Sequence, residues 1–365
     1  MEIVINALPY KQNSSGIGNL IRELFGRYVA VSSRQCKVIL TQDAPVFPGE
    51  PHGKMVRIPC KYQNSIRRIL FQIVGLGCYF CRNAVLLTTD SKIPFFLPHS
   101  CTAVTLVTDL AVYRMPEVYQ LSRVILWRVQ YWYIKRRANF FLAISEFTKR
   151  EMVEILNIPP ERIQVVYCAC SPSMVRVNAS EKNDKYRLPT KFLLFVGSHN
   201  PRKNLERVLQ AFDKAKDDIP HHLVIAGDSG WKFDQEAATQ GLKHKAEVHF
   251  IGFVPDEDMP WLYSAADLFL FPTLYEGFGI PVIEAQRCGT PVLTSNCSAL
   301  PETAGKGAYY VNPYDINSIS DGIKKILRDH ELSASLVREG YRNAERFSWE
   351  ASAARLDKII EENIL

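Results

Sequence analysis

The hydrophobic positions of the first half of the chain fall into short apolar runs separated by longer amphipathic stretches. The short runs predict strands at residues 2–7, 37–41, 84–88, 103–107 and 139–143. Stretches with helical spacing lie between them, at residues 19–30, 64–82, 119–138 and 146–156. Strands that alternate with helices in this way indicate a parallel sheet with helices on both faces.

The same alternation restarts after residues 171–190, a polar segment with two prolines that is the best linker candidate. Strands are predicted at 192–196, 222–226, 248–251, 268–271 and 291–294, and helices at 205–216, 256–265, 281–287, 316–329 and 331–345. Ser348 is the expected N-cap of one last helix. The pattern therefore predicts a second α/β domain.

Two carboxylates eight residues apart, Glu276 and Glu284, stand out in this second domain. The apolar run 266–273 precedes Glu276 as a buried strand, and 281–288 forms a helix that Gly289 ends. Ligands of open α/β sheets bind at the carboxyl ends of the strands, where Glu276 is expected. A carboxylate accepts two donors and so suits the vicinal diol of a sugar or ribose. Taken alone, the spacing is more typical of two solvated carboxylates, on the loop and on the helix.

A second candidate is the segment 197–204, which contains Ser198, Arg202 and Lys203 and is expected to join a strand to a helix. A helix N-terminus favours phosphate through its free N–H groups and partial positive charge. Arg can grip two phosphate oxygens, whereas Lys acts as a point charge. Cations oppose the dipole at this end of a helix, so a bound anion would relieve the conflict. The alternative is a pair of surface cations.

The segment around Gly16 and Gly18 also lies between a predicted strand and a predicted helix. Its backbone N–H groups could approach a ligand closely. The alternative is a tight turn without a ligand.

Residues 271–292, with the sequence F-P-T-L-Y-E-G-F-G-I-P-V-I-E-A-Q-R-C-G-T-P-V, resemble the retaining, nucleotide-sugar-dependent glycosyltransferases of family 4. Residues 195–205, 225–228 and 250–254 carry further motifs of this family, and 15–18, 107–110 and 144–148 match in patches. The resemblance implies the GT-B fold, in which two doubly wound Rossmann-like domains face each other across a cleft. It implies an acceptor-binding domain at 1–175, a donor-binding domain at 186–346, and a helix at 347–365 that crosses back to the first domain.

The resemblance also implies roles for individual residues. Arg202 and Lys203 would stabilise the diphosphate, Glu276 would contact the transferred sugar, and Glu284 would hold the ribose hydroxyls. The implied donor-binding set is Gly16, Gly18, Ser198, Gly252, Phe253, Val254, Gly277, Phe278, Gly279, Ile280 and Glu284, with the segment 252–254 at the base. For that segment, ordinary packing at a strand end is the alternative.

The chain departs from the family pattern at Thr108, where many relatives carry His. Threonine cannot titrate near neutral pH, so chemistry that needs a histidine base is in doubt here. The family mechanism tolerates the change, because the leaving phosphate itself accepts the acceptor's proton on the same face of the sugar. In an inverting enzyme, Asp109 would be the candidate base, although a loop cap is its alternative role. His99 is a weaker candidate.

No metal or other cofactor is expected. The motif Asp256-Glu-Asp258 has the spacing of a metal-binding D-x-D, but acids at the start of a helix are also favoured by the dipole. Cys78 and Cys81 form an isolated C-x-x-C without a second pair. Nine cysteines without regular spacing, and a start that favours a strand rather than a signal peptide, indicate a protein of the reducing cytosol.

Charge is unevenly divided, with 22 Lys and Arg against 11 Asp and Glu in residues 1–180, and 22 against 27 in the rest. Much of the excess lies in 61–74 and 123–137, where cations alternate with aromatic and aliphatic residues. This composition predicts two helices that bind an anionic membrane surface, with packed helices that have solvated cationic edges as the alternative. Nucleic acid is a poorer fit. The apolar run 69–81 is shorter than the ~20 residues that span a bilayer, so a cytoplasmic protein on the inner face of the membrane is expected.

These features predict a retaining hexosyltransferase. GDP-mannose is the preferred donor, because related mannosyltransferases of surface-polysaccharide and O-antigen synthesis share the motifs at 16–18 and 202–204, and UDP-hexoses stay open. The expected acceptor is a saccharide or a polyprenyl-diphosphate-linked saccharide. The alternatives are a nucleotide-sugar epimerase or a phosphorylase of the same fold, and a catalytically inactive sugar-nucleotide-binding subunit, which Thr108 would favour. The oligomeric state is not predicted.

Overall fold

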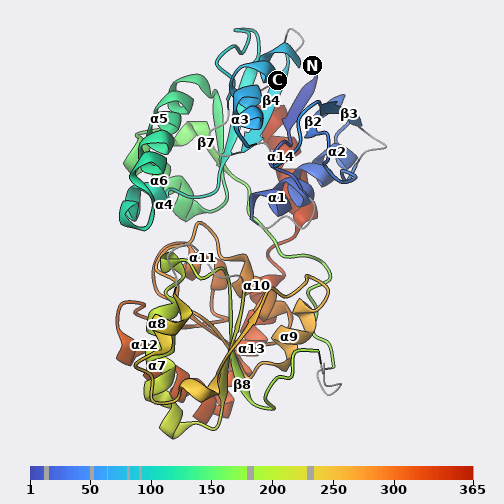
Figure 1. Ribbon diagram of the computed structural model, residues 1–365. Helices are drawn as coiled ribbons and strands as arrows, with labels where there is room; N and C mark the ends of the chain where they lie inside the picture. The colour runs from blue at the N-terminus through green and yellow to red at the C-terminus, as the bar shows by residue number, and fades with distance from the viewer. Residues whose placement is uncertain are drawn as a thin grey trace. The chain divides into compact units, whose positions relative to one another are not determined.

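The computed structural model of the chain forms two compact units (Figure 1). One unit comprises Met1–Cys168 and Ser348–Leu365, and the other comprises Ala169–Phe347. The structure describes residues 1–11, 16–49, 53–63, 65–79, 83–89, 93–178, 185–227 and 234–364.

The first unit is built on a seven-stranded, fully parallel sheet of order β3-β2-β1-β4-β5-β6-β7. Its strands are β1 Ile3–Asn6, β2 Cys36–Thr41, β3 Gly53–Ile58, β4 Val85–Thr89, β5 Thr102–Val107, β6 Phe140–Ala143 and β7 Ile163–Val165. The central strands β1 and β4 are buried along their whole length, because helices cover both faces of the sheet.

The helices of this unit lie between its strands in the sequence, except for α14, which ends the chain. They are α1 Ile17–Leu20, α2 Gly26–Val31, α3 Ser65–Ile73, α4 Ala111–Arg114, α5 Leu121–Arg137, α6 Glu146–Leu156 and α14 Trp349–Ile364, and a π-helical segment, Ile21–Phe25, joins α1 to α2. One apolar core of this unit combines strand residues with side chains from α5 and α6. The last helix, α14, packs on α2 and on the π-helical segment, and Ser352 on it donates a hydrogen bond to the carbonyl of Tyr167. It therefore belongs to the first unit.

The second unit has a six-stranded parallel sheet of order β10-β9-β8-β11-β12-β13. Its strands are β8 Phe192–Val196, β9 His222–Ala226, β10 Val248–Gly252, β11 Leu268–Phe271, β12 Val292–Ser295 and β13 Tyr309–Val311. Its helices are α7 Leu205–Ala215, α8 Gln235–Thr239, α9 Met259–Ala265, α10 Ile280–Arg287, α11 Leu300–Ala304, α12 Ile316–Arg328 and α13 His330–Ala344. In Figure 1, α7, α8 and α12 cover one face of this sheet, and α9, α10 and α13 cover the other.

The strand order of the second sheet reverses between β8 and β11. The chain runs outward from β8 through β9 to β10 and then returns to pair β11 with the free edge of β8. At such a switch point the loops that leave the two central strands diverge, and the crevice between them is where open α/β sheets bind ligands. The loops after β8 and β11 are those that hold the predicted basic and acidic residues.

Candidate active site

Glycines shape the loops at the carboxyl ends of β8, β9 and β10. The N–H group of Gly197 donates to the carbonyl of Ala226 at 2.9 Å, and that of Gly227 donates to the carbonyl of Gly252 at 2.8 Å. Gly227 has φ +137°, and a Cβ atom there would lie 2.1 Å from the carbonyl oxygen of Gly197. Only glycine permits this approach. The three loops are therefore tied together beside the switch point.

Arg202, Lys203 and Glu276 form an ion triad across the switch point. Lys203 Nζ lies 2.8 Å from Glu276 Oε1, and Arg202 Nη1 lies 3.3 Å from Glu276 Oε2. All three side chains are largely buried, with exposed fractions of 13%, 17% and 9% for Lys203, Arg202 and Glu276. The structure thus brings together both predicted phosphate-binding cations and the first of the two predicted carboxylates.

Backbone contacts hold the two loops of the triad against each other. The N–H group of Leu274 donates to the carbonyl of Arg202, and Arg202 Nη1 donates to the carbonyl of Tyr275, both at 2.9 Å. The buried Asn204 adds two hydrogen bonds from its amide, to the carbonyl oxygens of Pro272 at 2.8 Å and Pro313 at 2.7 Å. Asn204 itself has φ +64°, which turns the chain sharply just before α7. These hydrogen bonds hold the loop that carries Arg202 and Lys203 in a fixed conformation.

The local structure around Arg202 differs from the sequence-based expectation. Residues Pro201–Lys203 form a short 3₁₀ turn that Asn200 caps through its side chain, and α7 begins only at Leu205. The two cations thus precede the first turn of the helix. The anion that was expected to relieve their conflict with the helix dipole is supplied by Glu276 of the same chain.

The protonation of Glu276 follows from its partners. Burial alone would raise the pKa of this carboxyl, but the charges of Arg202 and Lys203 lower the pKa below its usual value. Glu276 is therefore ionised near neutral pH. Its two ion-pair contacts leave further lone pairs of the carboxylate available to a hydroxyl donor.

The loop from Glu276 into α10 presents mainly backbone. Gly279 has φ +103° and occupies the N-cap position of α10, which begins at Ile280 with Pro281 in its first turn. Phe278 is buried and packs edge-on against Phe347, with ring centroids 5.3 Å apart. The side chain of Phe278 therefore contributes to the core, and any ligand contact at residues 277–279 comes from the backbone.

Glu284 lies within α10, and its Oε2 atom accepts a hydrogen bond from the Tyr263 hydroxyl of α9 at 2.9 Å. Burial raises the pKa of Glu284 to about 7, the Tyr263 hydrogen bond opposes the rise, and the charge of Asp256 adds to it. Unlike Glu276, Glu284 pairs with neither Arg202 nor Lys203 in the described structure. The two carboxylates, eight residues apart, therefore have different charge states near neutral pH.

The remaining donor-binding candidates of the second unit lie at the ends of β8 and β10. Ser198 is exposed on the loop after β8. Gly252 ends β10 with φ +69°, Phe253 is exposed, and Val254 is buried. The exposed aromatic side chain of Phe253 suits a stacked base, and its role at the base stays a prediction.

The other predicted site residues belong to the first unit. Gly16, with φ +58°, is the N-cap of α1, and Gly18 is buried inside this short helix. Ser15, the first residue of the motif, is outside the described residues. Asp109 Oδ1 accepts a hydrogen bond from the N–H group of Ala111 at 2.9 Å, which is the loop-cap geometry considered above. Thr108 is partly buried, and His99 is exposed.

Of the alternative metal and redox motifs, the structure shows side-chain contacts of Asp258. Asp258 accepts hydrogen bonds from Lys185 at 2.8 Å and from the Tyr186 hydroxyl at 2.6 Å. Within the described parts of the chain, no group of three or more His, Cys, Asp or Glu side chains could hold a metal ion. Cys78 is exposed, and its motif partner Cys81 is outside the described residues, as is Asp228 of the 225–228 motif.

Sequence reasoning did not find Tyr263, Asn204 or Ser298. Ser298 has φ +57°, and its hydroxyl accepts a hydrogen bond from the N–H group of Glu276 at 3.2 Å. Asn204 belongs to the predicted phosphate-binding segment, so the sequence places it near Arg202 and Lys203. Its hydrogen-bond partners, Pro272 and Pro313, are distant in the sequence and could not be predicted. Nothing in the sequence links Tyr263 to Glu284.

Residues 178–343 match the family described as glycosyl transferases group 1. Over 265 residues the chain is 33% identical to the O-antigen chain mannosyltransferase B of Escherichia coli, an alignment that covers 70% of this chain and 69% of that protein. The chain belongs to the group 1 glycosyltransferases. A second relative of this glycosyltransferase, the serotype-specific mannosyltransferase WbdA of E. coli, is 32% identical over 60% of this chain and 28% of its own length. The aligned region therefore spans less than a third of that longer protein.

Solved structures place the glycosyltransferase in the GT-B fold, which confirms the predicted fold class. The sucrose-phosphate synthase of Thermosynechococcus elongatus superposes with a TM-score of 0.78 at 18% identity, covering 99% of this chain and 98% of that one. HepE of Anabaena, solved in complex with UDP-glucose, superposes with a TM-score of 0.74 at 17% identity over 99% of both chains.

Proposed function

We propose that this group 1 glycosyltransferase moves mannose from GDP-mannose to a saccharide, or to a polyprenyl-diphosphate-linked saccharide, with retention of the anomeric configuration. The observation that carries the proposal is the buried ion triad of Arg202, Lys203 and Glu276 at the switch point of the second sheet. Two cations and one carboxylate leave the triad one net positive charge, which favours an anionic ligand.

The choice of mannose rests on the relatives. Three of them carry the names O-antigen chain mannosyltransferase B, serotype-specific mannosyltransferase WbdA and, in Salmonella typhimurium, O-antigen chain mannosyltransferase RfbU. The HepE complexes contain UDP, so a UDP-hexose is the competing donor.

In the proposed reaction, Lys203 and Arg202 bind the diphosphate of the donor. Negative charge on this diphosphate grows as the bond from its oxygen to C1 of the sugar breaks, and fixed cations stabilise that charge most in the transition state. Glu276 holds both cations in position and offers its remaining lone pairs to a sugar hydroxyl. Glu284 accepts hydrogen bonds from the ribose, and Gly252, Phe253 and Val254 contact the base. The leaving phosphate takes the proton of the acceptor hydroxyl, so neither Thr108 nor Asp109 acts as a base.

We also place this enzyme at an anionic membrane surface, through α3 and α5 of the first unit. In the described part of the chain, no helix is both long and apolar enough to cross a bilayer. Helix α5 carries five basic residues and no acidic residue, and α3 carries two basic residues and no acidic residue. Basic residues near anionic lipids contribute about 1 kcal/mol each, so vesicle binding should weaken at high salt.

The nucleotide is tested by thermal denaturation with GDP, UDP and ADP. A ligand at 100 times its dissociation constant stabilises the folded protein by about 2.7 kcal/mol, so GDP is expected to raise the melting temperature above that of the other two. Release of GDP from GDP-mannose, followed with and without acceptor extracts and with a chelator present, then tests catalysis. Because two side-chain cations face the diphosphate, the chelator is expected to leave the rate unchanged. If UDP is the one nucleotide that stabilises the protein, the proposal of mannose transfer is wrong and a UDP-hexose is the donor. If a nucleotide binds but the donor is not turned over, the chain is a catalytically inactive binding subunit.

A further inference from the structure

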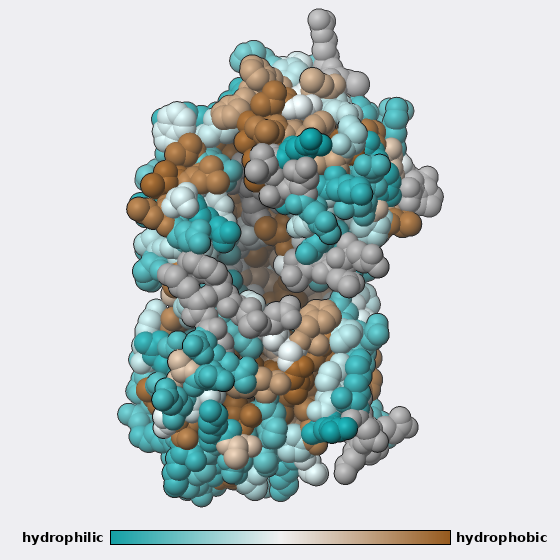
Figure 2. Space-filling model, in the orientation of Figure 1, coloured by the Kyte–Doolittle hydropathy of each residue, from teal (hydrophilic) through white to brown (hydrophobic). Residues whose placement is uncertain are grey.

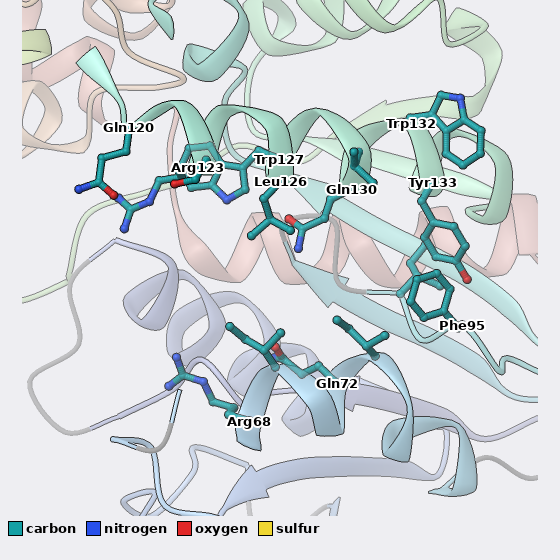
Figure 3. Close-up of a pocket in the computed structure, with 15 residues that line it drawn as sticks. Arg68, Gln72, Phe95, Gln120, Arg123, Leu126, Trp127, Gln130, Trp132 and Tyr133 are labelled. Atoms are coloured by element: carbon teal, nitrogen blue, oxygen red, sulfur yellow. The ribbon is translucent and has the colours of Figure 1, made fainter. Parts of the chain in front are cut away.

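A groove of about 710 Å³ lies in the first unit between α3 and α5. Most of its wall is apolar, and Figure 3 shows Leu126, Trp127, Tyr133 and Phe95 along it. Neither these side chains nor the groove take part in the site of the second unit.

The two ends of the groove differ in chemistry. Arg68 of α3 and Arg123 of α5 lie at the same end, and Tyr133 and Phe95 close the other, with ring centroids 4.8 Å apart (Figure 3). Arg68 contacts the ring and carbonyl of Tyr62, and Arg123 lies over the ring of Trp127. Neither guanidinium occurs among the arginine ion pairs of the described residues, so this end of the groove keeps its positive charge.

Gln72 lines the middle of the groove from the α3 side (Figure 3). Its side chain is 1% exposed, and its Nε2 atom finds no acceptor among the residues that the structure describes. A buried amide without a partner is unfavourable unless a ligand or a water molecule satisfies it. Because this amide nitrogen is buried beneath the groove surface, the accessible wall beyond the cationic end is mainly hydrocarbon.

The surface around the groove is also apolar. Exposed aliphatic and aromatic side chains on α3, α5 and the segment before β5 include Ile69, Leu70, Val74, Phe95, Phe96, Leu121, Ile125, Leu126, Val129 and Trp132. In the space-filling view, hydrophobic side chains gather over α3 and α5 (Figure 2). From residue 123 to residue 133 a helix rises about 15 Å, which is enough to lay a hydrocarbon chain of a dozen carbons along it.

We propose that this groove binds the hydrocarbon chain of a lipid phosphate, with the phosphate at Arg68 and Arg123 and the chain running toward Tyr133 and Phe95. Charge complementarity selects an anionic head, and the apolar wall selects an alkyl or isoprenoid tail over a peptide or a free sugar. The inference rests on the proposed function in one respect, because the acceptor proposed above is anchored by an isoprenoid chain that carries phosphate groups.

The test measures binding of farnesyl phosphate, below its micelle concentration, to the full chain without donor. Inorganic phosphate and farnesol serve as headgroup and chain controls. One equivalent of farnesyl phosphate is expected to bind at least tenfold more tightly than farnesol, and phosphate alone is expected not to bind. Failure of farnesyl phosphate to bind, or equal binding of farnesol, would overturn the proposal.

Two matched pairs of surface variants locate the site. Leu126→Glu, in the groove, is expected to weaken binding at least tenfold, whereas Leu121→Glu, on the same helix and 74% exposed but outside the groove, is expected to leave it within twofold. Arg123→Gln should weaken binding and Arg128→Gln, outside the groove, should not. Equal losses within either pair would mean that α5 attracts lipid only as a surface. GDP release from GDP-mannose is measured separately on the unaltered chain. Absence of farnesyl phosphate binding together with GDP release refutes this inference alone, whereas farnesyl phosphate binding without GDP release refutes the proposed function.

Discussion

Lys203→Ala is expected to lower the turnover number for sugar transfer by at least ~100-fold, as removal of a group that stabilises transition-state charge does in other enzymes. Lys203 Nζ is held 2.8 Å from Glu276 Oε1, so it is fixed before the donor arrives. Its loss leaves Arg202 as the one cation of the triad. The turnover number and the KM for donor are measured together, because a charge that acts mainly in the transition state affects the former more.

Loss of folding stability is the main alternative explanation for a lower turnover number in Lys203→Ala. Glu276 stays paired with Arg202 in this variant, so its buried carboxylate is not stranded without a counter-charge. Thermal denaturation checks that the fold persists, and Lys203→Arg keeps the charge while changing its geometry. Lys243→Ala, which removes an exposed lysine paired with Asp217 in the same unit, is the matched control and should keep full activity. A turnover number near that of wild type in folded Lys203→Ala would refute the role of the triad.

Glu284→Ala is expected to lower kcat/KM for the donor by at least ~100-fold, because the ribose would lose its acceptor and its orientation. Glu284→Gln keeps one acceptor oxygen and should fall between wild type and the alanine variant. The carboxylate of wild type accepts hydroxyl hydrogen bonds best when ionised, so donor affinity is expected to rise with pH through about 7, the pKa of Glu284 in the fold.

The same residue predicts the pH dependence of stability. Its folded pKa of about 7 lies above its ordinary value of 4.5, so the folded state binds the proton more tightly than the unfolded state. The free energy of unfolding should therefore fall as the pH rises between these values, and Glu284→Gln should lose that part of the dependence. If wild type and Glu284→Gln share the same pH profiles of both donor KM and melting temperature, Glu284 does not titrate as described.

The fold was largely predictable because both sheets are parallel and buried on both faces. Strands such as β8 and β11 are uninterrupted apolar runs, and their alternation with helices defines the doubly wound class. The strand β3 was missed, since its outward positions carry Lys54 and Arg57 and hide the hydrophobic pattern. The strands β7 and β13 have three residues each, too few for a periodic signal.

Helix lengths were less accessible to sequence reasoning. The expected helix at 64–82 ends as α3 at Ile73 and continues as a 3₁₀ segment, Gly75–Tyr79. The 3₁₀ segment passes close to Phe96, because a Cβ atom at Gly77 would lie 2.2 Å from the carbonyl oxygen of Phe96. Such a close approach depends on a residue 19 positions away, which no local pattern encodes.

The candidate site was predictable in its residues but not in its pairings. Arg202, Lys203, Glu276 and Glu284 stand out because of their motifs, and the family to which they point is confirmed. That Glu276 neutralises the two cations, whereas Glu284 bonds Tyr263 instead, depends on which loops meet at the switch point. The roles of the four residues in donor binding stay predictions.

A crystal structure of this glycosyltransferase with bound GDP tests the central claim most directly. The account predicts diphosphate oxygens within hydrogen-bond distance of Lys203 Nζ and the Arg202 guanidinium, and ribose hydroxyls on the Glu284 carboxylate. A nucleotide bound away from the ends of β8 and β11, with both cations still paired only to Glu276, would contradict it.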